Sequence, residues 1–279
     1  MSLVKSKEML LKAQAGGYAV GAFNAENLEM IQAIVAAAEK AHSPVIIQTT
    51  PGTLGYAPPE AFAGAACALA RAAQVPVAVH LDHGNSFELA KRCKEAGYTS
   101  LMIDGSLLPF EENVALTRSV VEMAGDIPVE AELGTVGGKE DSHSAGIQYT
   151  DPALAADFVS RTGVSSFAPA IGTAHGIYKD TPELKIDLLR EIKAKVGVPL
   201  VLHGTSGVPD ETVRECIASG ICKVNYATDL RKAFSQAVRT ALDNMPDAID
   251  PKKFLKEGRA AVEARVMELI DVCGSFGKA

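Results

Sequence analysis

The chain has 279 residues, of which 47% are apolar, and a net charge of −7 at neutral pH. This length and composition suit one large domain or two small ones with a sizeable core. Because the net charge is negative and the sequence has no long basic stretch, we expect neither nucleic acid nor a membrane surface as a partner.

The cysteines and the N-terminal residues bear on the cellular compartment. The five cysteines are scattered and include no CxxC pair, which is typical of reduced thiols in a cytoplasmic protein. The first residues, MSLVKSKEML, lack the apolar core of a secretory signal, and no uncharged apolar run is long enough to span a membrane. We therefore expect a cytoplasmic protein.

Short apolar runs rich in β-forming residues recur along the chain, and amphipathic stretches separate them. The predicted strands cover residues 18–24, 44–50, 76–83, 100–105, 128–134, 165–172, 199–204 and 222–228. Some prolines suit the first turn of a helix, namely Pro59, Pro152, Pro182 and Pro209. Ser86 and Asp151 suit N-cap positions. Several glycines suit the ends of helices, namely Gly97, Gly125, Gly163, Gly197 and Gly220.

This strand–helix alternation, repeated about eight times, predicts an α/β protein with a (β/α)8 TIM barrel that takes up residues 1–279 as one domain. The alternative is an open doubly wound sheet, but that fold usually carries GxGxxG after its first strand, and GAFNAE is not such a motif. The polar, glycine-rich stretch 137–150 is expected to be a mobile active-site loop. An additional helical segment from about Pro251 is expected to pack across the barrel or to reach a neighbouring subunit.

Three of the six histidines end apolar runs and stand directly before a glycine: His83 in HLDHG, His175 in GTAHG and His203 in VLHG. A glycine there lets the backbone approach a ligand closely. One such histidine alone is most simply a buried side chain that hydrogen-bonds the backbone. Three together match the number of protein ligands that a catalytic zinc takes while one position stays open. The sequence therefore predicts a zinc site.

Catalytic groups of a TIM barrel lie at the carboxyl ends of its strands. Besides the three histidines, these predicted ends carry carboxylates and an amide, namely Asp82, Asp104, Glu132, Asp229 and Asn225. Such a set of donors is typical of a metal site. The other three histidines are expected elsewhere. His80 suits the core or a position behind the metal ligands, His42 suits a helix end, and His143 suits a solvated loop.

Two polar turns follow the predicted seventh and eighth strands. HGTSG (203–207) leads into a helix near Pro209, and VNYATD (224–229) precedes the last barrel helix. Barrel enzymes often bind phosphate at these two loops through backbone N–H groups and a helix N-terminus. The candidate phosphate ligands are Gly204, Ser206, Asn225 and Thr228. A plain tight turn is the alternative interpretation of HGTSG.

The motifs HLDHG, MIDGS, VEAELG, GGKED, AIGTAHGIY, LHGTSG and KVNYATD follow one another along the chain. In this order and spacing they resemble the class II, zinc-dependent ketose-bisphosphate aldolases, from YAVGAFN to the VCGS tail. TPGT (50–53), Ala227 and VCGS look most like the tagatose-1,6-bisphosphate aldolases of this family. Many fructose-bisphosphate enzymes have a polar residue in place of Ala227. On the other hand, Gly84 is common among them, whereas familiar tagatose enzymes have a second histidine there.

The resemblance implies a metal centre and two acid–base groups. The catalytic Zn²⁺ would be held by His83, His175 and His203. Asp104 and Glu132 would form a secondary metal site or surround the zinc ligands. Asp82 would be the acid/base at the C4 hydroxyl, and Glu140 in GGKED would handle the proton at C3. A bound Zn²⁺ would neutralise the charge that develops on the substrate.

The resemblance also implies where the substrate binds. The phosphate of the dihydroxyacetone part would be held by the two polar turns, whose residues are Gly204, Thr205, Ser206, Asn225, Tyr226, Ala227 and Thr228. Backbone groups at Ala174, Gly176 and Gly204 would surround a monovalent cation, Na⁺ or K⁺. The family further implies a homodimer or homotetramer, and some tagatose-type relatives work with an accessory subunit.

The implied reaction is the reversible, zinc-dependent aldol cleavage of a ketose 1,6-bisphosphate to dihydroxyacetone phosphate and glyceraldehyde 3-phosphate. Tagatose-1,6-bisphosphate is the favoured substrate, and fructose-1,6-bisphosphate is the alternative. Three competing interpretations are a Schiff-base aldolase that uses Lys223, a zinc hydrolase, and a catalytically silent sugar-phosphate-binding accessory subunit. The intact Asp82, Glu140 and three histidines argue against the last.

Overall fold

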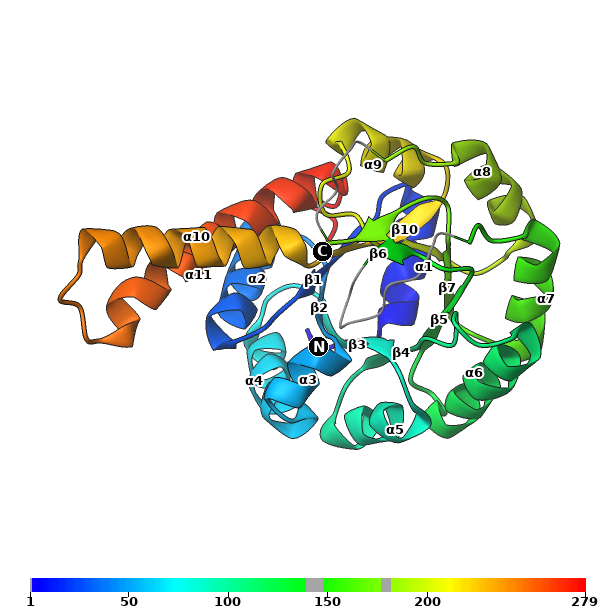
Figure 1. Cartoon of the computed structure of the whole chain (residues 1–279), viewed down its shortest axis with the longest axis horizontal. Coiled ribbons are helices and arrows are strands. Elements are labelled where there is room, and N and C mark those ends of the chain that lie inside the picture. The colour runs from blue at the N-terminus through cyan, green and yellow to red at the C-terminus, as the bar shows by residue number, and fades with distance from the viewer. Residues whose placement is uncertain (1, 139–147, 177–181) are drawn as a thin grey trace.

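The computed structural model describes residues 2–138, 148–176 and 182–279. Within it, eight parallel strands close into a barrel in the order β1-β10-β9-β7-β5-β4-β3-β2 (Figure 1). Their bounds are Val20–Asn24 (β1), Val45–Thr49 (β2), Val77–Gly84 (β3), Ser100–Ile103 (β4), Val129–Leu133 (β5), Ser166–Pro169 (β7), Leu200–Leu202 (β9) and Ile221–Tyr226 (β10). Each predicted strand overlaps one of these strands. The predicted (β/α)8 barrel is therefore confirmed, and the open doubly wound sheet is excluded.

A ring of helices covers the outside of the barrel (Figure 1). Their bounds are Leu28–Ala41 (α2), Pro59–Ala72 (α4), Phe87–Ala96 (α5), Phe110–Ala124 (α6), Pro152–Thr162 (α7), Ile186–Lys195 (α8), Asp210–Ala218 (α9) and Thr228–Asn244 (α10). The outer core lies between these helices and the outward-facing strand residues, and it includes Phe23, Ile47, Phe158 and Phe167. Apolar burial between the two layers stabilises the barrel.

Most of the predicted helix signals lie where the helices begin and end. Ser86 accepts a hydrogen bond from the Leu89 N–H at the start of α5, and Asp151 caps α7 in the same way. Pro59 and Pro152 open α4 and α7, and Pro209 directly precedes α9. Gly97, Gly125 and Gly163 are C-caps, and Gly197 and Gly220 directly follow the C-caps of α8 and α9.

The prediction for Pro182 was wrong, because α8 begins only at Ile186. Residues 182–185 have no helical structure. The Lys185 N–H donates to the Ile171 carbonyl at 2.8 Å, a residue that follows β7. This bond keeps the segment against the barrel until the helix can start, a constraint that proline placement alone does not reveal.

The helix α1 (Ser6–Gly16) precedes the barrel and was not predicted. Its Met9, Leu10 and Ala13 are buried against apolar residues from the inside of the barrel, namely Val20, Ala22, Ile46, Ala78 and Cys222. These residues lie near the N-terminal ends of their strands, so α1 closes that end of the barrel. The inward positions further along the same strands are polar, beginning with Asn24, Gln48, His80 and Lys223. The barrel interior thus changes from apolar to polar toward the carboxyl ends of the strands.

Three further elements lie at or near the carboxyl ends of the barrel strands. The short helix α3 (Pro51–Tyr56) follows β2 and is capped by Thr50. The strands β6 (Gly137–Gly138) and β8 (Ala174–His175) pair in parallel, with Gly138 opposite His175. This small sheet joins the segment after β5 to the segment after β7. Residues 139–147, most of the loop predicted to be mobile, lie outside the described part of the chain.

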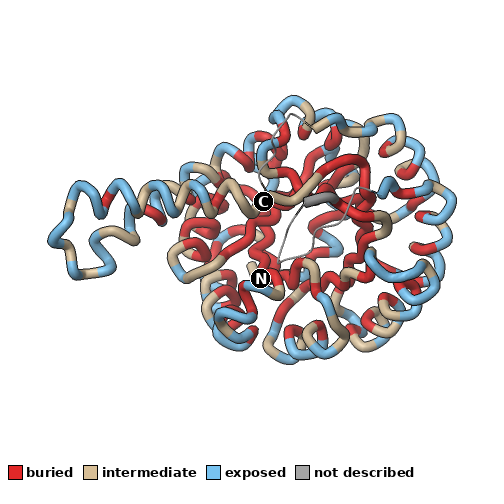
Figure 2. Tube along the Cα trace, viewed as in Figure 1, coloured by how far each residue is buried: buried red, intermediate tan, exposed pale blue. Residues whose placement is uncertain are grey.

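The helix α11 (Pro251–Val272) folds back along α10 and packs against α2. The two helices form a hairpin that projects from the side of the barrel (Figure 1). Figure 2 shows that the outer part of this hairpin is largely exposed. The segment after Pro251 is helical as predicted, but it does not pack across the barrel. Among the described residues, no helix has the length and apolar character needed to cross a bilayer.

Candidate active site

The three histidines that precede glycines come together at the carboxyl ends of the strands. His83 is the penultimate residue of β3, His175 lies on β8 and His203 directly follows β9. Nitrogen atoms from all three lie within 4.8 Å of one another. The rings of His83 and His203 are nearly perpendicular, with centroids 4.6 Å apart, and the His83 and His175 rings have a similar arrangement at 4.8 Å. The structure therefore assembles the predicted histidine cluster.

The backbone of His83 has an uncommon conformation at the histidine cluster. His83 has a φ of 48°, in the left-handed region that residues other than glycine rarely adopt. Such conformations persist where surrounding contacts hold them, often at functional sites. Here the Nδ1 atom of His83 lies 2.8 Å from Oδ2 of Asp104.

Carboxylates fix which nitrogen each of two histidines presents to the cluster. Asp104 accepts the Nδ1–H of His83, and Oε1 of Glu130 lies 2.8 Å from Nε2 of His203 and accepts its N–H. The remaining nitrogens, Nε2 of His83 and Nδ1 of His203, face each other at 2.8 Å. Two imidazole lone pairs that close repel unless a cation or a proton lies between them. Three imidazole nitrogens with carboxylates behind two of them are a donor set that suits a transition metal.

The surroundings of the three histidines shift their pKa values in opposite directions. Burial opposes the charged form of His83, but the nearby Asp82 and Asp104 carboxylates outweigh it and raise its pKa well above the ordinary value. Burial, together with the charge on the neighbouring histidines, lowers the pKa of His175 and of His203. A metal entering this cluster must therefore displace a proton from His83.

Asp104 and Glu132 lie beside the cluster, as the sequence predicted. They form with His83 a second group whose ligand atoms lie within 4.8 Å of one another. Burial and the Asp104 charge raise the pKa of Glu132 well above its ordinary value. Oε2 of Glu132 accepts no hydrogen bond from the described residues and lies 3.7 Å from Nδ1 of His203. Glu132 therefore has an acceptor directed toward the possible metal ligands.

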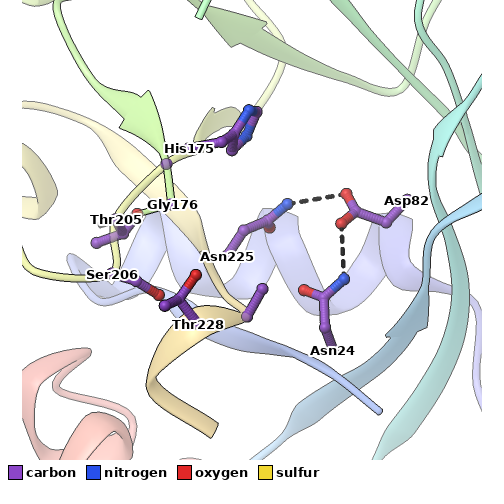
Figure 3. A pocket seen from close by; sticks show the side chains of 10 residues that line it. Asn24, Asp82, His175, Gly176, Thr205, Ser206, Asn225 and Thr228 are labelled. Carbon is purple, nitrogen blue, oxygen red and sulfur yellow. Dashed lines mark hydrogen bonds between the residues drawn. The ribbon is translucent and has the colours of Figure 1, made fainter. Parts of the chain in front are cut away.

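Asp82 is buried on β3 and is held by three side-chain amides. It accepts hydrogen bonds from Asn24 at 3.0 Å, Gln48 at 3.1 Å and Asn225 at 3.0 Å. Figure 3 shows the bonds from Asn24 and Asn225. Burial alone would raise the pKa of Asp82, but the charges of His83 and His203 lower it. Asp82 is thus a carboxylate in a fixed orientation beside the histidine cluster.

Asn24 and Gln48 were not predicted as site residues. Each is the polar residue at an inward position near the end of an otherwise apolar strand, in GAFN and VIIQT. That position was the available signal, because inward polar residues in a buried strand need partners. Their amides also bond each other, with Nε2 of Gln48 donating to Oδ1 of Asn24 at 2.8 Å.

A pocket opens beside Asp82 and His175 (Figure 3). Its other lining residues are Asn24, Gly176, Gly204, Thr205, Ser206, Asn225, Ala227 and Thr228. The helix α10 begins at Thr228, so its N-terminal N–H groups lie at this pocket. The fully buried Tyr226 points the other way and stacks on Phe23, with ring centroids 5.8 Å apart. Only the backbone of Tyr226 is therefore placed to contact a ligand in this pocket.

Two glycines near the histidine cluster lie where the backbone closely approaches other groups. Gly204 has a φ of 62°, and a Cβ there would lie 2.8 Å from the carbonyl group of Ala174. A Cβ on Gly84 would overlap the Met102 carbonyl oxygen and lie 2.8 Å from Cδ2 of Leu81. Gly84 therefore marks the close approach of β3 to β4.

Three further candidate residues do not line the pocket. His80 is buried inside the barrel, as predicted, and His42 is the exposed C-cap of α2. Lys223 is buried beneath the histidines, with Nζ 2.9 Å from Oε2 of Glu130, and it does not line the pocket. This placement disfavours the Schiff-base alternative. Glu140 and His143 lie outside the described residues.

The closed barrel, with a histidine cluster and a carboxylate at the carboxyl ends of its strands, defines a TIM-barrel protein with a candidate metal site. Residues 4–278 match the sequence model of the family described as fructose-bisphosphate aldolase class-II, and the chain belongs to this family. It is an aldolase, an enzyme of the carbon–carbon lyase class.

Relatives of known name resemble the chain over nearly its full length. It is 47% identical, over 100% of both chains, to the D-tagatose-1,6-bisphosphate aldolase subunit GatY of Klebsiella oxytoca. The crystal structure of the YdjI aldolase from Escherichia coli K12 has a TM-score of 0.88 and 39% identity, covering 99% of each chain. A candidate fructose-1,6-bisphosphate aldolase from Coccidioides immitis has a TM-score of 0.92 and 32% identity, covering 100% of this chain and 99% of that one.

Proposed function

We propose that the protein catalyses the reversible aldol cleavage of tagatose-1,6-bisphosphate to dihydroxyacetone phosphate and glyceraldehyde 3-phosphate, with Zn²⁺ held by His83, His175 and His203. The observation that carries this proposal is the position of Asp82. Its carboxylate lines the same pocket as His175 and lies beside the histidine cluster. An acid–base group thus lies beside a metal donor set, as this reaction requires.

In this proposal, Asp82 takes the proton from the C4 hydroxyl. Cleavage of the C3–C4 bond needs a base that takes this proton as the C4 carbonyl forms, and the reverse reaction needs the same group to return it. Asn24, Gln48 and Asn225 fix the carboxylate and satisfy it with N–H groups. A bound Zn²⁺ would stabilise the negative charge that develops on the dihydroxyacetone part. Orientation of the base by rigid strands preserves its alignment with the substrate.

The turn after β9 and the start of α10 form the proposed phosphate site. Gly204, Thr205, Ser206 and Thr228 line the pocket there, and N–H groups at a helix N-terminus favour an anion. The Oγ atom of Ser206 accepts a hydrogen bond from the Asp229 N–H at 3.3 Å, which ties the two turns together. A monovalent cation near Ala174, Gly176 and Gly204 belongs to the same proposal and rests on the family resemblance.

Glu140 is proposed as the group that moves the proton at C3. The proposal rests on the GGKED motif, since Glu140 lies outside the described residues. Replacing it with alanine should slow the exchange of the C3 proton of dihydroxyacetone phosphate with deuterium from solvent. Exchange at the wild-type rate would remove Glu140 from this role.

The preference for tagatose over fructose rests on Ala227 and on the name of the GatY relative. Ala227 lines the pocket and offers no side-chain hydrogen bond. The two bisphosphates differ only in configuration at C4, so a polar group close to that hydroxyl can select between them. Gly84 does not line this pocket and lies instead where β3 approaches β4.

A kinetic comparison of the two bisphosphates tests this proposal. We expect kcat/KM to be higher for tagatose-1,6-bisphosphate, and Ala227→Ser to shift the ratio toward fructose-1,6-bisphosphate. A fructose preference of about tenfold or more, which corresponds to about 1.4 kcal/mol, would overturn the assignment of the substrate. Absence of cleavage with either sugar would overturn the proposed reaction itself.

A further inference from the structure

A continuous chain of buried polar side chains runs through the barrel interior, from the histidine cluster to helix α1. His203 contacts Glu130 on β5 at 2.8 Å, and Glu130 contacts Lys223 on β10 at 2.9 Å. Lys223 lies 3.3 Å from Nε2 of His80 on β3. The chain continues through Ser100 on β4 and ends at Ser6 of α1, with distances of 2.7 Å and 2.8 Å. We call these five residues behind His203 the interior polar chain.

The ammonium group of Lys223 determines which atoms donate and which accept in the hydrogen bonds of this chain. An ammonium group only donates hydrogen bonds, so Nε2 of His80 must accept from it. Nδ1 of His80 then carries the hydrogen and donates to Oγ of Ser100. The hydroxyl groups of Ser100 and Ser6 form the next hydrogen bond, at 2.8 Å. Burial and the charge of Lys223 lower the pKa of His80 to about 3, so His80 is neutral, as this arrangement requires.

Glu130 links Lys223 to His203 and determines which nitrogen of His203 donates. Both oxygens of Glu130 accept hydrogen bonds, Oε2 from Lys223 and Oε1 from Nε2 of His203. Burial opposes the charge on Glu130, but Lys223 and His203 hold its pKa well below its ordinary value. Asn225 is a weaker neighbour of Nε2, because its amide lies 3.4 Å away and donates to Asp82 at 3.0 Å.

We propose that Glu130 and Lys223 are positioning residues that set the tautomer of His203, so that its Nδ1 lone pair faces Nε2 of His83 in the histidine cluster. The inference rests on the metal site of the proposed function. It gives Lys223, a fully buried lysine with no place in the pocket, a defined role. Asp104 does the same for His83 from the other side of the cluster.

The isosteric variant Glu130→Gln tests the proposal, because it reverses the direction of the chain. Lys223 can only donate, so the amide must turn its oxygen toward Lys223 and its NH₂ toward His203. Nε2 of His203 then accepts, and the hydrogen moves to Nδ1, where the metal should bind. We expect the affinity for Zn²⁺, measured by competition with a chromophoric chelator, to fall by about 10–100-fold. The absorption spectrum of the Co²⁺-substituted protein should change as well.

The double variant Glu130→Gln/Lys223→Met separates positioning from mere structural support. Without Lys223, the amide can turn its oxygen back to His203 and its NH₂ toward Nε2 of His80, which lies 4.0 Å from Oε2 of Glu130. We therefore expect the second substitution to restore most of the Zn²⁺ affinity. A merely structural network predicts that the double variant binds Zn²⁺ no better than the single one. The matched control is Tyr98→Phe, which removes a buried 2.7 Å hydrogen bond to Thr49 and should leave Zn²⁺ affinity unchanged.

The outcomes are distinct. Wild-type protein that takes up no Zn²⁺ overturns the proposed metal site and this inference together. Zn²⁺ uptake by the wild type combined with wild-type affinity in Glu130→Gln, or with no recovery in the double variant, overturns the inference alone. If Glu130→Gln does not fold, nitrogen-15 NMR of the Zn²⁺-loaded wild type decides. We expect a protonated Nε2 on His203, and an unprotonated Nε2 would overturn the inference.

Discussion

Nε2 of His83 and Nδ1 of His203 face each other at 2.8 Å, while a carboxylate holds the opposite nitrogen of each ring. This arrangement places two lone pairs where only a cation or a shared proton is stable. In the absence of metal, the proton belongs to His83, whose pKa its neighbours raise well above the ordinary value. Metal binding and proton binding at this site are therefore competitive.

Zinc affinity should consequently rise with pH. Because the metal binds deprotonated His83, affinity is lost as pH falls below the raised pKa of this residue. For the metal-free protein the sign is opposite. A raised pKa in the folded state contributes stability below the unfolded value of about 6.5, and that contribution is lost as pH rises through the folded pKa. Zn²⁺ competition titrations and urea unfolding of the metal-free protein, each across pH, check the two signs. A Zn²⁺ affinity independent of pH would contradict the competition.

Removal of metal should abolish cleavage. Dialysis against a chelator should inactivate the enzyme, and Zn²⁺ or Co²⁺ should restore it. His203→Ala should lose both bound metal and activity, since it removes one of three imidazole donors. Metal content and cleavage rate are measured on the same samples. Full activity in metal-free protein would contradict the proposed role of the histidines.

Asp82→Ala should retain Zn²⁺ but lose cleavage. General acid–base groups contribute about 10²–10⁴-fold, and we expect kcat to fall within this range. Asp82 is buried and its partners are amides, so its loss leaves their N–H groups unsatisfied. Thermal unfolding therefore accompanies the kinetics, and metal analysis serves as the control. A variant that keeps Zn²⁺ and cleaves at more than about a tenth of the wild-type rate would exclude Asp82 as the base.

Gly84→Ala and Gly64→Ala should have opposite effects on stability. A Cβ on Gly84 would overlap the Met102 carbonyl, whereas a Cβ on Gly64, in α4, meets nothing within 4 Å. Overpacking of this kind costs about 1–3 kcal/mol, and a glycine-to-alanine change at a compatible helical position stabilises by about 0.4–1 kcal/mol. Urea unfolding of both variants measures the difference. Equal stability of the two variants would show that β3 can move away from β4.

The buried thiols should make the protein less stable at alkaline pH. All five cysteines are buried and free, and burial raises the pKa of Cys93, Cys216 and Cys273 to about 12. Between the unfolded value of about 8.5 and this folded value, only the unfolded chain ionises, so the free energy of unfolding falls as pH rises. Each of these thiols should remove about 2 kcal/mol between pH 8 and pH 10.

Thiol reactivity provides an independent check on this prediction. The native protein should react very slowly with a disulfide reagent, and all five thiols should react after unfolding. Thiolate absorbance in the native protein near pH 9 would contradict the raised pKa values.

The sequence by itself determined the barrel and the three histidines of its cluster. Alternating strands and helices are local patterns, and parallel strands in a barrel place all their carboxyl ends at one rim. Once His83 and His203 were assigned to such ends, their convergence followed from topology, whereas His175 reaches the cluster from β8, beyond the end of β7. Tyr226 was predicted with the phosphate-binding residues, whereas the structure turns its side chain outward onto Phe23.

Only the tertiary structure decided how these groups are oriented. The nitrogen that His203 presents depends on Glu130 and Lys223, which come from other strands. The anchors of Asp82 likewise come from β1, β2 and β10. The two-residue strands β6 and β8 are too short to show a periodicity, and the fold of α11 against α2 depends on packing between distant segments. Hydrogen-bond direction and packing are set by contacts across the chain, whereas sequence patterns record only local spacing.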